Sequence, residues 1–302
     1  MKTIYLNATD PMNESNLALC LGFFDGVHLA HQTLLRETIL QAKKRQLEPA
    51  MMTFSTHILS HIRKEPFFHL TSLNDKIEIA RDMGFSYFYV LVVTDEMIGL
   101  SPQDFIDRFL SMQRLILVGF DFTFGFRGKG NAAWLQEQTS FETIVLPEMD
   151  YANEKIGSTR IRALIQEGQM EEAEMLLGMP YTIHGEVIHG KNRGKALGFP
   201  TANLRHEGYM RPKSGVYVAK VEIDGNRFDG LANIGDNPTF DDDDISIEVH
   251  ILDFQGQIYG KRIALSFLHF LREEIKYHSV NDLIEQMMQD VLDARVILKE
   301  RS

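Results

Sequence analysis

Apolar runs alternate with helix-like segments along the first half of the chain. Five apolar runs predict buried strands, at residues 17–22, 50–54, 87–93, 114–119 and 142–147. Helical spacing of apolar residues predicts helices between them, over residues 29–46, 72–83, 101–112 and 131–138. Apolar strands joined by single helices form parallel sheets that helices cover on both faces. The pattern therefore predicts a doubly wound α/β domain.

The second half of the chain follows a different pattern. Residues 215–223 alternate in the manner of a strand, and Asp224-Gly225 then supplies a hairpin turn. Residues 245–251 alternate likewise, with isoleucine and valine on one face and Glu248 on the other. Short antiparallel strands with turn signals indicate a small barrel or sandwich.

A closing helix is expected from Ser279, with an apolar stripe of Leu283, Met287, Val291 and Ala294. The boundary between the two patterns is expected near Gly178 to Pro180. We thus expect an α/β domain over residues 1–179. Residues 180–302 are expected to form a small antiparallel β-barrel with a closing helix.

Composition narrows the class of protein. The 302 residues are 44% hydrophobic and 24% charged, as in a soluble globular protein. No apolar run approaches the roughly 20 residues needed to span a bilayer, and the first residues lack the apolar core of a signal peptide. The single cysteine, Cys20, excludes an internal disulfide framework. We expect a cytoplasmic protein that does not enter the membrane.

The charge is acidic overall and basic in one segment. A net charge of −11 argues against a general nucleic-acid-binding surface. Residues 189–213, however, carry six Lys or Arg residues and one acid, Glu207. A basic, glycine-rich segment in an acidic chain indicates a site for a small polyanion such as a nucleotide phosphate, although an ordinary solvated loop would have the same composition.

Residues 22–35, "GFFDGVHLAHQTLL", follow an apolar strand and begin a helix. Ligands of open parallel sheets bind beyond the carboxyl ends of strands, and a helix start favours phosphate there. His28 and His31, three residues apart, would share one side of the first turn and could stabilise phosphoryl charge. Capping or core packing would also explain two histidines here. The segment lacks the Walker phosphate-loop pattern.

Residues 189–204, "HGKNRGKALGFPTANL", can surround an anion with backbone N–H groups and positive charge. Thr201 and Asn203 follow a stiffening proline, and their hard oxygen atoms suit Mg²⁺ that is shared with substrate phosphates. A glycine-rich surface loop is the simpler alternative.

Two further segments carry candidate chemistry. In residues 156–162, "IGSTRIR", Ser158 or Thr159 can cap a helix and bind phosphate, while Arg160 and Arg162 can neutralise it. A plain helix cap would use the same residues. Glu248 faces away from the apolar side of its strand, so it is either a solvent-facing carboxylate or a general base.

Motifs along nearly the whole chain resemble one enzyme family. Residues 22–32, 118–131 and 156–162 are similar to the flavin-nucleotide branch of the HxGH nucleotidyltransferases. Residues 189–203 match the riboflavin kinase motif without a break, and "GVYVAKV", "LANIGDNPTF", "EVHILDFQGQIYG" and "FLREEIKY" follow in the family's order. The chain resembles the bacterial bifunctional riboflavin kinase/FAD synthetases.

The resemblance implies two reactions. A kinase phosphorylates riboflavin to FMN with ATP and Mg²⁺ and releases ADP, and a nucleotidyltransferase adenylylates FMN to FAD and releases pyrophosphate. It implies an FMN adenylyltransferase domain over residues 1–179 and a riboflavin kinase domain over residues 180–302. Flavins are substrates and products, nucleic acid is not a partner, and protein partners are not implied.

The resemblance also implies a set of site residues. The catalytic residues would be Glu248, as the base of the kinase, together with His28 and His31. The expected flavin contacts are Phe54, Phe124, Asn233, Thr239 and Arg272, and the expected metal ligands are Thr201 and Asn203. The expected nucleotide- and phosphate-binding residues are Gly22, Phe24, Asp25, Asp121, Ser158, Thr159, Arg160, Arg162, Gly190, Lys191, Arg193, Gly194 and Gly198.

Two departures from the family pattern concern the first half. Ala30 stands where the family has glycine, and its methyl group could crowd a nucleotide that approaches the backbone. Residues 53–58, "TFSTHI", lack both prolines of the family's Pro-His-Pro element. These departures motivate an alternative, a riboflavin kinase with an impaired adenylyltransferase domain. A non-catalytic flavin or nucleotide sensor is the remaining alternative.

Overall fold

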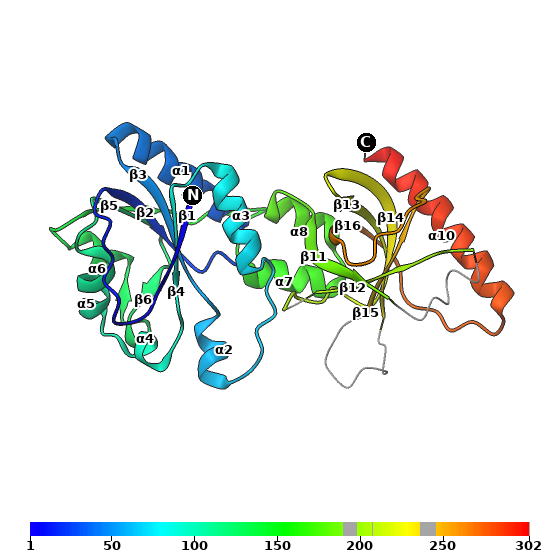
Figure 1. Ribbon diagram of the computed structural model, residues 1–302, viewed down its shortest axis with the longest axis horizontal. Coiled ribbons are helices and arrows are strands. Elements are labelled where there is room, and N and C mark those ends of the chain that lie inside the picture. The colour runs from blue at the N-terminus through cyan, green and yellow to red at the C-terminus, as the bar shows by residue number, and fades with distance from the viewer. Residues whose placement is uncertain (190–197, 207, 236–245, 302) are drawn as a thin grey trace. The chain divides into compact units, whose positions relative to one another are not determined.

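The computed structural model describes residues 1–189, 198–206, 208–235 and 246–301 (Figure 1). Contacts divide the chain into a first unit, Met1–Ser158, and a second unit, Thr159–Ser302.

A six-stranded parallel sheet forms the centre of the first unit. Its strands, in the spatial order β1-β4-β3-β2-β5-β8, are all paired in parallel. Their bounds are β1 Lys2–Leu6, β2 Leu17–Leu21, β3 Glu48–Phe54, β4 Tyr87–Leu91, β5 Leu115–Gly119 and β8 Glu142–Leu146. Five of these strands, all except β1, coincide with or overlap the apolar runs that predicted them.

Helices cover both faces of this sheet. The larger ones are α1 (Leu29–Arg45) and α3 (Leu73–Met83), which pack through Leu34, Leu35 and Ala80 against Ala18 and Cys20 of β2. On the opposite face, Leu17, Leu19 and Leu21 belong to a second core with Phe105 and Leu135. Because successive residues of β2 enter different cores, the strand is apolar throughout. The doubly wound α/β fold is confirmed.

Shorter elements complete the first unit. They are α2 Ile58–Arg63, α4 Asp95–Gly99, α5 Pro102–Phe105, the π-helical turn Ile106–Leu110, β6 Thr123–Phe124, the 3₁₀ turn Phe126–Gly128, β7 Gly130–Asn131, α6 Ala132–Gln136, β9 Asp150–Tyr151 and β10 Glu154–Lys155. The helix predicted over residues 101–112 is therefore an α-helical turn that continues as a π-helix.

The second unit contains a closed antiparallel barrel. The strand order is β11-β12-β15-β14-β13-β16, and β16 pairs back with β11. The bounds are β11 Tyr181–Ile188, β12 Ala202–Arg205, β13 Gly215–Ile223, β14 Asn226–Gly235, β15 Ser246–Ile251 and β16 Arg262–Arg272. The hairpin turn predicted at Asp224-Gly225 joins β13 to β14. The predicted barrel is confirmed.

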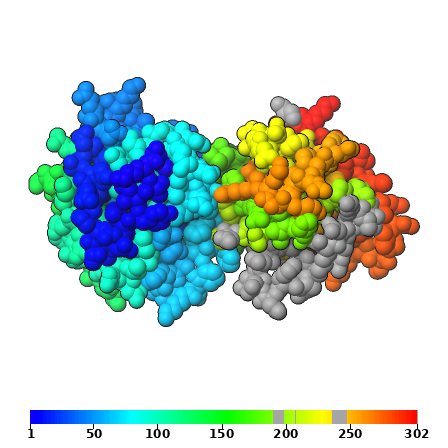
Figure 2. All heavy atoms as spheres, viewed as in Figure 1, coloured from blue at the N-terminus to red at the C-terminus, as the bar shows by residue number. Residues whose placement is uncertain are grey.

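The closing helix, α10 (Val280–Glu300), begins at the expected residue. Ser279 is its N-cap, and the Ser279 hydroxyl accepts a hydrogen bond from the backbone N–H of Asp282. Ala294 and Leu298 are buried against the barrel. Figure 2 shows α10 in orange and red at the surface of the second unit. No helix in the described part of the chain is both long and apolar enough to cross a membrane.

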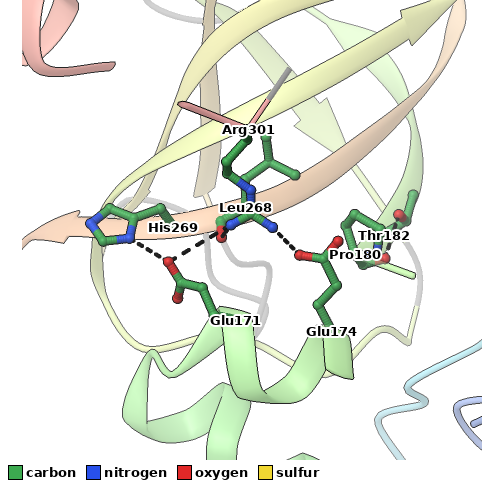
Figure 3. A network of polar contacts seen from close by, with 7 residues as sticks. All are labelled: Glu171, Glu174, Pro180, Thr182, Leu268, His269 and Arg301. Atoms are coloured by element: carbon green, nitrogen blue, oxygen red, sulfur yellow. Dashed lines mark hydrogen bonds and ion pairs between the residues drawn. The ribbon is translucent and has the colours of Figure 1, made fainter. Parts of the chain in front are cut away.

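Two helices, α7 (Ser158–Glu167) and α8 (Met170–Leu177), precede the barrel. A polar network ties α8 to it (Figure 3): Glu171 accepts a hydrogen bond from Nδ1 of His269 on β16, at 2.5 Å. Arg301, at the end of α10, donates to the carbonyl oxygen of Leu268 and pairs with Glu174. The contacts of α8 thus place this helix with the barrel. The sequence instead predicts that the boundary between the adenylyltransferase and kinase domains follows residue 179. That functional boundary stays a prediction.

Candidate active sites

The winding direction of the parallel sheet reverses at β2. Strands β3 and β4 lie on one side of β2, and β5 and β8 lie on the other. Ligands of open α/β sheets bind at the carboxyl ends of the strands at such a reversal. The segment after β2 starts at Gly22, and the segment after β5 contains Asp121. Both candidate segments therefore lie where the topology favours a site.

The loop from Gly22 to His28 has an unusual backbone. Phe24, Gly26 and Val27 have φ values of 54°, 85° and 41°. Positive φ is strained for a β-branched residue such as Val27 and concentrates at functional sites. A Cβ at Gly22 would lie 3.0 Å from the Phe24 ring, so glycine lets that ring pack against the backbone.

Asp25 anchors this loop in two directions. Its carboxylate Oδ1 accepts a hydrogen bond from the backbone N–H of Leu70 at 2.9 Å, and the Asp25 side chain is buried. Its carbonyl oxygen accepts a hydrogen bond from the Ser158 hydroxyl at 2.8 Å. Two expected phosphate-binding residues, Asp25 and Ser158, are therefore brought together.

The carbonyl oxygen of Phe23 is a second anchor. It accepts hydrogen bonds from the Thr53 hydroxyl at 3.1 Å and from the Lys76 ammonium at 2.7 Å. The Lys76 ammonium also lies 4.2 Å from the centroid of the Phe23 ring. Lys76 is 1% exposed, so its charge is satisfied inside the protein.

His28 is the N-cap of α1, and His31 follows in the first turn. Nδ1 of His28 accepts a hydrogen bond from the backbone N–H of His31 at 3.5 Å. A neutral His28 therefore carries its proton on Nε2, which can donate to a ligand. Burial lowers the pKa of His28 to about 4. Burial and the neighbouring His28 ring lower the pKa of His31 well below its ordinary value.

Sequence reasoning missed an aromatic cluster beside this loop. The Phe23 ring contacts the rings of His57 and Phe67 edge-on, with centroids 5.1 and 5.5 Å away. His57 and Phe67 stack at 4.6 Å, and His69 meets Phe67 at 4.9 Å. His57 lies in the "TFSTHI" segment, whose sequence did not reveal the stacking partners of this histidine.

The other expected residues of the first unit differ in exposure. Asp121 has a side chain that is 56% exposed and pairs with Lys155 at 2.6 Å. Phe54 is half-buried at the end of β3. Phe24 and Phe124 are buried in the two cores, where neither ring is open to solvent. Thr159, Arg160 and Arg162 lie on α7 and belong to the second unit.

Three polar residues align across the barrel. Asn203 on β12 is in register with Glu248 on β15, and Glu248 is in register with Asn233 on β14. Register partners project to the same face of a sheet. Their neighbours Ile247 and Val249 are buried inside the barrel, so the polar row lies on the outer face.

This outer face forms one wall of a cavity of about 330 Å³, within the range of small-molecule sites. Helix α10 contributes Leu283, Met287, Asp290 and Val291 to the lining. The barrel and its connections contribute Phe199, Thr201, Val216, Leu231, Ala232, Asn233, Glu248, His250, Arg272, Glu274, Ile275 and Tyr277. The cavity thus gathers Thr201, Asn233, Glu248 and Arg272, which the sequence had proposed separately.

Hydrogen bonds connect the polar residues of the cavity. The Thr201 hydroxyl donates to Oε2 of Glu248 at 3.3 Å, and the Asn233 amide donates to Glu274 at 3.3 Å. Nδ1 of His250 lies 2.9 Å from the carbonyl oxygen of Pro200. Glu274 and His250 were not identified from the sequence, although both lie in segments that match the family.

Arg272 is bound by a carboxylate of the closing helix. Its Nε and Nη2 donate to Oδ1 and Oδ2 of Asp290 at 2.8 and 2.6 Å. These hydrogen bonds raise the pKa of the Arg272 guanidinium. The amphipathic spacing of α10 places Asp290 on the buried face of the helix. The sequence alone does not predict that Arg272 is the partner of this carboxylate.

Several expected residues remain to be placed. Gly190, Lys191, Arg193, Gly194 and Thr239 lie outside the described residues. Gly198 is described, and its φ of +88° is a conformation that favours glycine.

The donor set of the cavity fits magnesium. Thr201 and Glu248 line the cavity, and Asn203 is in register with Glu248 on the neighbouring strand. They offer hydroxyl, carboxylate and amide oxygen atoms, and Mg²⁺ prefers such ligands together with water and substrate phosphates. Among the described residues, no group of three or more His, Cys, Asp or Glu side chains could hold a metal ion.

Comparison with known families assigns the two halves separately. A family model described as FAD synthetase matches residues 10–160, and one described as riboflavin kinase matches residues 177–298. A solved structure described as a macrolide-efflux protein from Streptococcus pneumoniae has a TM-score of 0.88 and 33% identity, covering 97% of this chain and 98% of that chain.

Full-length relatives carry both names. The bifunctional riboflavin kinase/FMN adenylyltransferase of Listeria monocytogenes is 42% identical, covering 98% of each chain. The protein of the same name from Bacillus subtilis is 36% identical over 97% of each chain, and that from Escherichia coli K12 is 31% identical over 93% of each. The chain therefore belongs to the bifunctional riboflavin kinase/FMN adenylyltransferase family, as its motifs predicted.

Proposed function

We propose that this chain phosphorylates riboflavin to FMN with ATP and Mg²⁺, and then adenylylates FMN to FAD. The observation that carries the kinase reaction is the cavity in which Thr201, Asn233 and Glu248 meet. We assign the kinase to residues 180–302 and the adenylyltransferase to residues 1–179. The enzyme is expected to work in the cytoplasm, in keeping with its single buried thiol, Cys20.

In the kinase reaction, the ribityl hydroxyl of riboflavin attacks the γ-phosphorus of ATP, and ADP leaves. Glu248 accepts the hydroxyl proton, and the hydrogen bond from Thr201 orients its carboxylate. Bound Mg²⁺ would neutralise phosphate charge, held by Thr201 and Asn203. Asn233 and Arg272 line the cavity and would contact the flavin. Gly190, Lys191, Arg193, Gly194 and Gly198 would bind the nucleotide phosphates, and Thr239 the flavin.

In the adenylyltransferase reaction, the phosphate of FMN attacks the α-phosphorus of ATP, and pyrophosphate leaves. His28 would donate its Nε2 proton to a phosphate oxygen, and His31 would support the same charge from the next position of the first turn. Asp25 and Ser158 would fix the loop between β2 and α1. Gly22 and Asp121 would complete the proposed nucleotide site, with Phe54 on the flavin side. The rings of Phe24 and Phe124 are buried in the two cores and could support this site only from behind. Thr159, Arg160 and Arg162 of α7 stay candidate phosphate-binding residues.

The test separates the two reactions. Riboflavin, ATP and Mg²⁺ should give FMN, and FMN with ATP and Mg²⁺ should give FAD, both measured by chromatography. Absence of FAD while FMN is still produced would support the impaired-adenylyltransferase alternative, which the family match over residues 10–160 does not favour. Binding of flavin without either product would support a sensor.

A further inference from the structure

A buried carboxylate of α10 faces the cavity. Asp290 is 3% exposed and lines the cavity from its helical side. Besides the two hydrogen bonds from Arg272, its Oδ1 accepts one from Nε2 of Gln286 at 2.9 Å. A buried charge is costly unless it is paired and hydrogen-bonded. The charge of Asp290 is paired only while the Arg272 guanidinium stays hydrogen-bonded to it.

The same contacts fix the plane of the guanidinium. A guanidinium has five N–H groups, and Arg272 donates two of them to Asp290 and one to the carbonyl oxygen of Glu273, at 3.0 Å. The other two N–H groups have no acceptor among the described residues. Since Arg272 lines the cavity, these groups are available to acceptor atoms of a bound ligand.

We propose that Asp290 is a positioning residue of the kinase: it holds the Arg272 guanidinium in the orientation in which its remaining N–H groups bind acceptor atoms of the flavin. This inference rests on the proposed kinase function. A planar guanidinium held at three points loses little further freedom when it binds a planar acceptor edge, so the orientation contributes to affinity before the ligand arrives.

A second ion pair provides a matched control. Arg295 on α10 donates from Nη2 to Oδ1 and Oδ2 of Asp253 at 2.9 and 2.8 Å. This pair also joins α10 to the end of β15, but its side chains are 50% and 74% exposed, and neither residue lines the cavity. If ion pairs only attach α10 to the barrel, loss of either pair should affect the kinase in the same way.

The experiment compares Asp290→Asn with Asp253→Asn in the full chain. We expect Asp290→Asn to raise the KM for riboflavin by about tenfold. The Kd for riboflavin in the absence of ATP, measured by flavin fluorescence, should rise by the same factor, which corresponds to about 1.4 kcal/mol. The KM for ATP should stay within about twofold, and Asp253→Asn should change none of these constants by more than about twofold. Asp290→Glu should restore part of the riboflavin affinity.

Other outcomes overturn the inference. Three results would show that Asp290 only attaches α10 to the barrel. These are unchanged KM and Kd values for riboflavin in Asp290→Asn, equal losses of affinity for riboflavin and ATP in that variant, or an equal loss of riboflavin affinity in Asp253→Asn. If Asp290→Asn does not fold, Arg272→Lys replaces it, because lysine can pair with Asp290 but cannot present the planar fork. Wild-type riboflavin affinity in Arg272→Lys would then reject the proposal. Failure of the wild type to phosphorylate riboflavin would instead reject the proposed kinase function.

Discussion

The imidazole rings of His28 and His31 stack almost parallel, with their centroids 3.7 Å apart. Two imidazolium cations would repel each other at this distance, and burial disfavours each charge further. The arrangement therefore requires neutral rings, which suits the role of His28 as an N-cap that accepts a backbone N–H through Nδ1.

Acidification should destabilise the protein through this pair. The pKa of His28 is about 4 in the folded protein and about 6.5 when unfolded. Between these pH values the unfolded state binds the additional proton, so the free energy of unfolding falls as pH falls. For His28 alone we expect a loss of roughly 3 kcal/mol from pH 7 to pH 4. Urea unfolding across this range should show a shallower pH dependence for His28→Gln, whereas His278→Gln, an exposed control, should keep the wild-type slope.

Lys76→Met should loosen the loop between β2 and α1. The carbonyl oxygen of Phe23 would lose its hydrogen bond to the ammonium, at a cost of about 1–3 kcal/mol in the free energy of unfolding. FAD formation from FMN should slow more than riboflavin phosphorylation, because the affected loop belongs to the first unit. Lys44→Met, on an exposed position of α1, serves as the control. Equal slowing of both reactions would contradict a local effect.

Ala30→Gly tests whether the methyl group crowds the nucleotide. Ala30 is the second residue of α1, in the turn whose N–H groups would face the phosphates. Removing the methyl should raise kcat/KM for FAD formation by roughly tenfold if it costs about 1.4 kcal/mol in the transition state. The helix itself should lose no more than about 1 kcal/mol. The kinase rate of the same variant is the internal reference, and an unchanged FAD rate would show that alanine is accommodated.

Glu248→Gln should lower kcat for FMN formation by about 10²- to 10⁴-fold, because a neutral amide cannot accept the hydroxyl proton. Riboflavin binding should persist, since the side chain keeps its size. Glu222→Gln on β13, whose partner is Arg227 at the surface, is a matched strand control. Full kinase activity in Glu248→Gln would remove the base assignment.

Sequence periodicity was sufficient for five strands of the parallel sheet and for the hairpin strands and β15 of the barrel. It did not predict β11, β12 or β16. It missed β1, Lys2–Leu6, because two of its residues are exposed and no helix precedes it to mark the alternation. It predicted one helix over residues 101–112, since the π-helical turn at Ile106–Leu110 keeps nearly the same apolar face. Backbone hydrogen-bond spacing is not encoded in a hydrophobic pattern.

The candidate sites divide in the same way. Glu248 and Thr201 were accessible from motifs, because each lies in a contiguous match. Asp290 and the stacked pair His57 and Phe67 were not, because their significance depends on partners distant in the sequence. A carboxylate on an amphipathic helix is commonly solvated, and only the folded chain shows that this one is buried against a guanidinium.

The register of three barrel strands has a consequence for evolution by insertion and deletion. Asn203, Glu248 and Asn233 face outward because each occupies the same parity in its strand. Deleting one residue within β15 ahead of Glu248 would turn this carboxylate toward the barrel interior and present an apolar side chain to the cavity. Ahead of these three residues, a strand can therefore change length only in steps of two if the same side chains are to face the cavity.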